Sequence, residues 1–133
     1  MAEHQRVAGI GGVFFKAARP AELAAWYRAH LGVPVPEGQT YATFGAAASD
    51  ATGTPAQCVW SAFPADTEYL GAGPASCMVN YRVTDLDAML AQLRAAGATV
   101  DDKIDDSEFG RFGWAMDPEG NRFELWQPPA AGS

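Results

Sequence analysis

The sequence predicts an α+β domain built from two βαβββ modules, and three observations lead to this fold class. A strand that runs into a helix ending at a glycine occurs twice, as GGVFFKAARPAELAAWYRAHLG and as MVNYRVTDLDAMLAQLRAAG. Each copy is followed by residues typical of three further short strands. The copies lie roughly 65 residues apart, which is too long for a solenoid array and fits a duplicated half-domain. We therefore expect the function to lie where the two modules face each other.

The chain is long enough for a single core that both modules share. It has 133 residues, of which 48% are hydrophobic, and half-size modules must combine their sheets to bury enough surface. We expect one domain over residues 1–133, with module one at residues 7–63, a linker at 64–75 and module two at 76–128. The linker is predicted from its turn-forming residues.

In module one, the pattern predicts a strand at residues 7–17 and a helix that begins at Pro20 and ends at Gly32. Two short strands follow, at residues 41–44 and 58–63. Apolar side chains at helical spacing predict that the helix buries one stripe. That stripe consists of Leu23, Trp26, Tyr27 and Leu31.

In module two, the pattern predicts a strand at residues 76–83 and a helix at 86–96, with Asp85 available to cap its first turn. A closing hairpin is expected from strands at 112–117 and 122–127, which flank the turn sequence PEGN. The helix has its own apolar stripe at helical spacing. That stripe consists of Leu86, Met89, Leu90 and Leu93.

One face of the predicted sheet carries aromatic and methionine side chains around a few polar ones. Because strand side chains alternate, the side chains that point away from the two helices should form a shared surface. The predicted ligand-binding residues on it are Phe14, Lys16, Met78, Asn80, Arg82, Trp114, Met116 and Trp126, with Glu124 as the candidate catalytic group. Such a mixture is typical of a small-molecule cavity, although the same face could instead pack solidly between the modules.

Glu124 lies between Phe123 and Leu125 near the centre of the last strand, where an unpaired carboxylate is costly to bury. It therefore needs a cation, a hydrogen-bond donor or a water-filled space beside it. Arg82 and Lys16 are the partners that the strand pattern suggests.

The charge of the chain disfavours a nucleic-acid partner. The formal net charge is −7, whereas binding to a phosphate backbone relies on a face rich in Lys and Arg. An acidic run at residues 101–108 predicts a solvated loop before a strand, or a surface that attracts a cationic ligand.

No apolar stretch approaches the roughly 20 residues of a membrane span, and no secretory signal is visible at the N-terminus. We expect a cytoplasmic protein with no membrane partner.

The chain resembles the vicinal oxygen chelate superfamily, which includes glyoxalases, bleomycin resistance proteins and extradiol dioxygenases. The resemblance covers roughly residues 9–128 and is carried by the helix at 20–32 with its Trp-Tyr pair, by YRVTDLDAMLAQLRAAGATV and above all by MDPEGNRFELWQP. It implies an open eight-stranded, partly barrel-like sheet with helices on the outside. It also implies a homodimer.

The resemblance implies a divalent metal held by two histidines and a glutamate. These ligands lie on the strands that face the hollow between the two modules, which we call the cup. Carried over residue by residue, the glutamate position is Glu124, and the histidine positions fall on Gly12 and Met78. His4 lies eight residues before Gly12, which along a strand is roughly 26 Å. Because tight sites take about three or four protein ligands, we expect no complete metal site and name no cofactor.

Three functions remain open on the sequence alone. The first is a metal-independent binder of a small molecule in the cup, for which aromatic walls and an acidic chain favour a flat, cationic guest. The second is a lyase, isomerase or dioxygenase-like enzyme acting on a small oxygenated substrate, with Glu124 as base or metal ligand and Arg82 or Lys16 stabilising an enolate. The third is a structural or partner-binding module, which predicts no cavity.

Overall fold

The computed structural model describes residues 4–45, 58–71 and 76–129. The first elements in chain order are β1 (Gly9–Ala17), α1 (Pro20–Leu31), β2 (Tyr41–Phe44) and β3 (Cys58–Pro64). They are followed by β4 (Cys77–Arg82), α2 (Leu86–Ala95), β5 (Thr99–Val100), β6 (Asp105–Ser107), β7 (Gly110–Met116) and β8 (Arg122–Gln127).

All eight described strands belong to one open, mixed sheet. Its order is β2-β3-β1-β4-β8-β7-β5, and β6 pairs with β7. The first strand of each half pairs in parallel with the last strand of the same half, β1 with β3 and β4 with β8. The antiparallel pairing of β1 with β4 joins the two halves. The predicted α+β fold class is therefore confirmed, with three of the described strands in the first half and five in the second.

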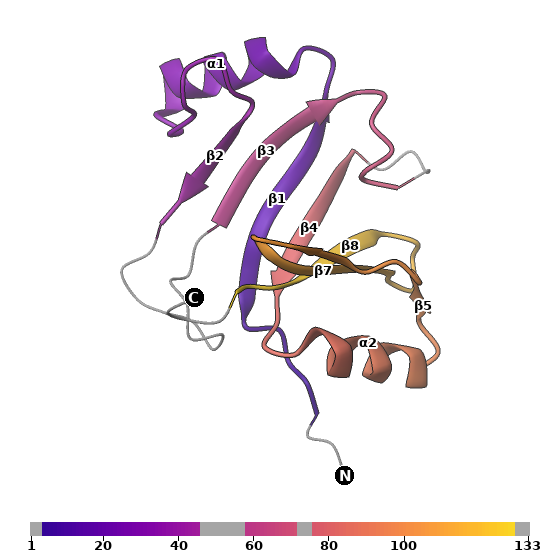
Figure 1. Ribbon diagram of the computed structural model, residues 1–133. Coiled ribbons are helices and arrows are strands. Elements are labelled where there is room, and N and C mark those ends of the chain that lie inside the picture. The colour runs from indigo at the N-terminus through magenta and orange to yellow at the C-terminus, as the bar shows by residue number, and fades with distance from the viewer. Residues whose placement is uncertain (1–3, 46–57, 72–75, 130–133) are drawn as a thin grey trace.

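The sheet is strongly twisted, and its two helices lie far apart on it (Figure 1). The strands β7 and β8 run at a steep angle to β1 and β3 in this view, so the two halves of the sheet do not lie in one plane. The helix α1 contacts β1 and β3, whereas α2 contacts β5, β7 and β8. Both helices are thus outside the region where the two halves of the sheet meet.

Several boundaries differ from the sequence predictions. The first strand begins at Gly9, and β7 begins at Gly110, two residues before its predicted start. The acidic run is not only a loop, because β6 lies within it and pairs with the start of β7. Asp106 of this strand accepts a 2.8 Å hydrogen bond from Arg111 across the turn. Gly110, with φ of 120°, supplies the backbone conformation that this tight turn needs.

The predicted buried stripe of α1 is wrong for two of its members. Trp26 is 52% exposed and Leu31 is 64% exposed, whereas Ala24 is fully buried. Ala24 packs with Val35 and Ala42, and these small side chains let the helix approach the sheet closely. The helix α1 is therefore held to the sheet by small side chains around Ala24 and by the ring of Tyr27, which packs against Phe15 and Trp60.

The stripe of α2 is buried as predicted and forms the core of the second half. Leu86, Met89 and Leu90 pack against Leu125 of β8. Gly113 of β7 lies directly beneath the helix, where an added Cβ would come within 3.2 Å of Leu90 Cδ1. The glycine thus allows the helix and the sheet to pack closely at this point.

We expect Leu90→Ala to destabilise the protein by about 2–5 kcal/mol, because it removes a fully buried side chain and leaves a cavity under α2. The matched control is Leu31→Ala, which makes the same change at an exposed helical position. Urea denaturation of both variants measures the difference. Equal losses of unfolding free energy would contradict this description of the core.

Candidate functional site

A cavity of about 610 Å³ lies where the two halves of the sheet face each other. Most of its walls are aromatic: Phe14, Tyr41, Phe63, Tyr69, Phe109, Phe112 and Trp126 line it. The remaining lining residues are Gly11, Thr43, Val59, Ser61, Asn80 and Glu124. Strand alternation explains the pattern, since every second residue of β2 and β3 points inward. Among the described residues, the lining contains no Lys, Arg or His.

Of the described residues that line the cavity, only Glu124 on β8 is acidic, and it is 1% exposed. Its Oε1 accepts a hydrogen bond of 2.6 Å from Asn80 Nδ2, on the neighbouring strand β4. Its Oε2 accepts a bond of 2.9 Å from Trp114 Nε1 on β7 and another from the hydroxyl of Tyr69. The donors in the described part of the chain are thus three neutral side chains, and they replace the ion pair expected with Arg82 or Lys16.

Burial raises the pKa of Glu124 above its ordinary value, and the hydrogen bonds from Tyr69, Asn80 and Trp114 oppose that rise. Burial also raises the pKa of Tyr69 strongly, with a further contribution from the nearby Glu124 carboxylate. The phenol of Tyr69 therefore remains protonated at neutral pH and acts as a donor. Glu124 is a stronger base than an exposed carboxylate once it is ionised.

Gly11 fixes the position of Asn80 through a close approach. A register shift in the pairing of β1 with β4 falls between Ile10 and Gly12. An added Cβ at Gly11 would collide with Asn80 Oδ1 and would lie 2.9 Å from Trp126 Cε3. Within the described residues, Asn80 Oδ1 is buried and accepts no hydrogen bond. The missing side chain at Gly11 is thus what leaves room for the amide that binds Glu124.

Five of the nine residues predicted for the cup meet there. Phe14, Asn80, Glu124 and Trp126 line the cavity, and Trp114 lies behind it as a donor to the carboxylate. Met78 is also on this side of the sheet, but it is 1% exposed and packs with Phe14, Leu70 and Trp114. It supports the cavity wall rather than lining it.

Three predicted residues lie elsewhere. Met116, at the end of β7, is 38% exposed and borders a separate surface hollow with Ala96 and Thr99. Lys16 is half-buried near the end of β1, outside the cavity lining. Arg82 is buried beside Gly11 and pairs in register with Trp126, but it is not among the described residues that line the cavity. Strand alternation gives the side of the sheet correctly, but not the position along the strand at which the cavity ends.

Sequence reasoning missed several of the described lining residues, and Tyr69 and Phe109 are the two that lie outside the predicted strands. Tyr69 lies in the predicted linker, where it was not expected to reach the cup, yet its ring stacks on Phe63 with centroids 5.4 Å apart. The signal in the sequence was a pair of large apolar residues, Tyr69 and Leu70, within a segment of turn-forming residues. In the structure Leu70 is 1% exposed, and its burial holds this segment against the sheet. Phe109 lies in the turn between β6 and β7. Its backbone carbonyl accepts a 2.7 Å hydrogen bond from Trp126 Nε1.

The residues beside Glu124 do not fit the metal site that the resemblance implies. Gly12 offers no side chain, and Met78 is enclosed in an apolar cluster. A cation at Glu124 would face N–H and O–H groups, which donate to the carboxylate and repel a positive charge. Within residues 4–45, 58–71 and 76–129, no three His, Cys, Asp or Glu side chains are grouped as ligands would be. No step below therefore involves a metal.

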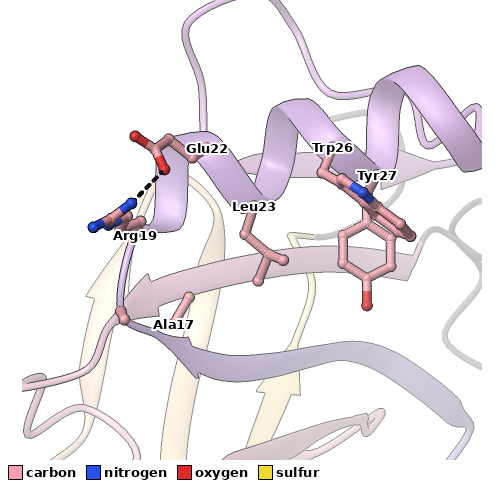
Figure 2. Close-up of a pocket in the computed structure, with 7 residues that line it drawn as sticks. Ala17, Arg19, Glu22, Leu23, Trp26 and Tyr27 are labelled. Atoms are coloured by element: carbon pink, nitrogen blue, oxygen red, sulfur yellow. Dashed lines mark hydrogen bonds and ion pairs between the residues drawn. The ribbon is translucent and has the colours of Figure 1, made fainter.

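A second hollow, of about 570 Å³, lies on the outer surface between the end of β1 and α1. Figure 2 shows Trp26 and Tyr27 along the helix and the ion pair of Arg19 with Glu22 at its first turn. That pair is 3.4 Å long, and both side chains are more than 70% exposed, so it contributes little energy. The hollow has no buried polar group aimed into it, and we therefore place the candidate site in the cup.

Comparisons with known proteins agree on the fold. Residues 12–126 match the family described as the glyoxalase-like domain. The solved methylmalonyl-CoA epimerase from Mycobacterium tuberculosis is 24% identical, with a TM-score of 0.65 over 97% of this chain and 93% of that one. The epimerase from Streptomyces coelicolor, in complex with 2-nitronate-propionyl-CoA, is 19% identical, with a TM-score of 0.68 over 96% and 99%. A search of curated proteins gives no match.

These similarities establish the architecture, and at such identities they do not transfer a substrate. The helices α1 and α2, which are those of the described residues, lack the length and apolar content of a membrane span. The cytoplasmic location and the homodimer stay predictions.

We expect Gly11→Ala to cost about 1–3 kcal/mol of unfolding free energy, because the added methyl group displaces Asn80 and crowds Trp126. Gly45→Ala is the control, since a Cβ there meets no atom of the described residues within 4 Å and should change stability by less than about 0.5 kcal/mol. Thermal or chemical denaturation distinguishes the two. If both variants were equally stable, the close approach at Gly11 would not be required.

The raised pKa of Glu124 predicts how stability depends on pH. Its contribution is fully present below the unfolded value of about 4.3 and is lost as the pH rises through the raised folded value. The unfolding free energy of the wild type should therefore fall relative to that of Glu124→Gln across this window. Glu37→Gln, on the exposed surface, corrects for the change in net charge. A difference that stayed constant with pH would contradict the raised pKa.

Proposed function

The chain belongs to the glyoxalase-like domain family, and we propose that within this fold it binds a small, flat organic molecule in the cup. The observation that carries the proposal is a cavity of about 610 Å³ with seven aromatic side chains around one buried carboxylate. Cavities of roughly 300–1,000 Å³ with apolar walls and a few polar groups are typical ligand sites. A module that only joined other proteins would not need this hollow.

The lining favours a guest that is uncharged or cationic. Aromatic rings make large, low-entropy contacts with flat molecules and attract cations over their faces. The lining residues in the described part of the chain include a carboxylate, an amide and four hydroxyls, but no basic side chain that could pair with an anion. An anionic group would therefore have to remain at the mouth of the cavity.

An isomerase or lyase is the second candidate, and the environment of Glu124 supports it. A base works best when its pKa approaches the working pH, and burial moves the pKa of Glu124 in that direction. The solved methylmalonyl-CoA epimerases show that proteins of a similar fold include an isomerase. Such an activity would use the same cavity, with the substrate bound next to Glu124.

Calorimetric titration with three naphthalene probes tests the binding proposal. The probes are 2-naphthol, 2-naphthylmethylammonium and 2-naphthoate, which share a ring system and differ in charge. We expect saturable binding of the neutral and cationic probes and weaker binding of the anion. Saturation by none of them, or tightest binding of 2-naphthoate, would contradict the proposal.

A variant pair assigns that binding to the cup. Phe112 lines the cavity, and its change to Ala should weaken binding about tenfold, because one aromatic wall is lost. Phe44 lies on β2 outside the lining, so Phe44→Ala should leave the affinity unchanged. Equal losses in both variants would place the binding elsewhere.

A further inference from the structure

The Glu124 carboxylate has one acceptor position that is not used within the described structure. Each carboxylate oxygen accepts about two hydrogen bonds. Oε2 accepts from both Tyr69 and Trp114, whereas Oε1 accepts only from Asn80. Because Glu124 lines the cavity, a ligand can approach this carboxylate. The free lone pair on Oε1 is the position from which Glu124 can accept a proton.

Tyr69 is held rigidly beside this carboxylate. Its ring stacks on Phe63 at 5.4 Å with an interplanar angle of 22°, and it lies edge-on to Trp114 at 6.2 Å. Its hydroxyl donates to Glu124 Oε2, and the residue also lines the cavity. A carbonyl group bound next to Glu124 therefore lies within reach of the same phenol. The high pKa of Tyr69 means that the phenol donates a hydrogen bond without losing its proton.

The groups expected to stabilise a negative charge in the cup do not line it. Lys16 and Arg82 both lie outside the cavity lining, so neither is in place to contact an enolate oxygen there. Tyr69 and Asn80 are the lining donors that bond to the carboxylate, and the phenol of Tyr69 carries the more acidic proton of the two. It can therefore take the role that a cation would otherwise have.

We propose that Glu124 and Tyr69 act together as base and hydrogen-bond donor, and that they remove and return a proton at the carbon next to the carbonyl of a flat, uncharged ketone. The inference rests on the proposed function, because the ketone must first bind in the cup. It names Tyr69 as a catalytic residue and neutral, enolisable aromatic ketones as the substrate class.

The proton transfer balances without any further reactant. Glu124 Oε1 takes the proton from the carbon, and the C–H electron pair forms the C=C bond of an enolate. The carbonyl π electrons move to the oxygen, and the Tyr69 O–H, whose single proton bonds to Glu124 Oε2 in the free protein, turns to donate to that oxygen as the carboxyl group becomes neutral. The proton then returns from Glu124 to the enolate, either at the original carbon or at another carbon of the conjugated system. This step regenerates the carboxylate. A positioned base contributes roughly 10²–10⁴-fold and one oxyanion donor roughly 10²–10³-fold to such a rate.

Hydrogen–deuterium exchange of 2-tetralone in D₂O tests this inference. This bicyclic ketone is neutral and planar around its carbonyl, and proton NMR follows the loss of its C1 signal. Calorimetry on the same samples measures its binding. We expect the wild-type protein to accelerate exchange over buffer, Tyr69→Phe to lower the enzymatic rate about 100-fold while the Kd changes little, and Glu124→Gln to abolish it.

The control is Tyr81→Phe, because Tyr81 lies on β4 next to Asn80 but packs against Phe123 with the helix-side core. It should retain wild-type exchange. Circular dichroism of each variant checks that it is folded.

Binding of 2-tetralone with exchange at the buffer rate, or full exchange in Tyr69→Phe, would overturn the inference and leave the binding proposal intact. If the naphthalene probes bind and 2-tetralone does not, the substrate class and the inference are wrong, whereas failure of every probe contradicts the proposed function itself.

Discussion

The structure depends on how the buried Glu124 carboxylate is accommodated between the two halves of the sheet. Burying such a group costs several kcal/mol unless its oxygens are hydrogen-bonded. The three donors come from different parts of the chain: Tyr69 from the segment after β3, Asn80 from β4 and Trp114 from β7. Each must be in place for the carboxylate to be tolerated. The site therefore links the packing of both halves to the chemistry of one group.

The same arrangement sets the reactivity of the site. Burial outweighs the three hydrogen bonds, so the pKa of Glu124 lies above its ordinary value. In the described part of the chain, the aromatic walls carry no positive charge that could neutralise an anionic ligand. The donors also conflict with a metal ion, because they occupy the carboxylate with N–H and O–H groups. A family resemblance that implies a metal thus coexists with a site that is suited to hydrogen bonding and proton transfer.

The sequence predicted the fold class and much of the site because both depend on local periodicity. Strand alternation placed Phe14, Asn80 and Glu124 on the same side of the sheet, and helical spacing identified the buried side of α2. It could not locate Met116 or Tyr69 correctly. Met116 shares the face but lies outside the cavity, and Tyr69 reaches the cavity through an irregular segment that has no periodic pattern. Such tertiary features depend on contacts between distant residues.

The resonance of the Trp114 indole N–H tests the central claim most directly, since this group donates to Glu124 at 2.9 Å. In a ¹⁵N-¹H NMR titration, this signal should shift with pH with a midpoint above the ordinary pKa of glutamate, about 4.3, and the shift should vanish in Glu124→Gln. The indole of Trp60, which packs against the rings of Phe15 and Tyr27, serves as the internal reference. A Trp114 signal that did not respond to pH, or that followed an ordinary carboxylate, would contradict the account of a buried, hydrogen-bonded base.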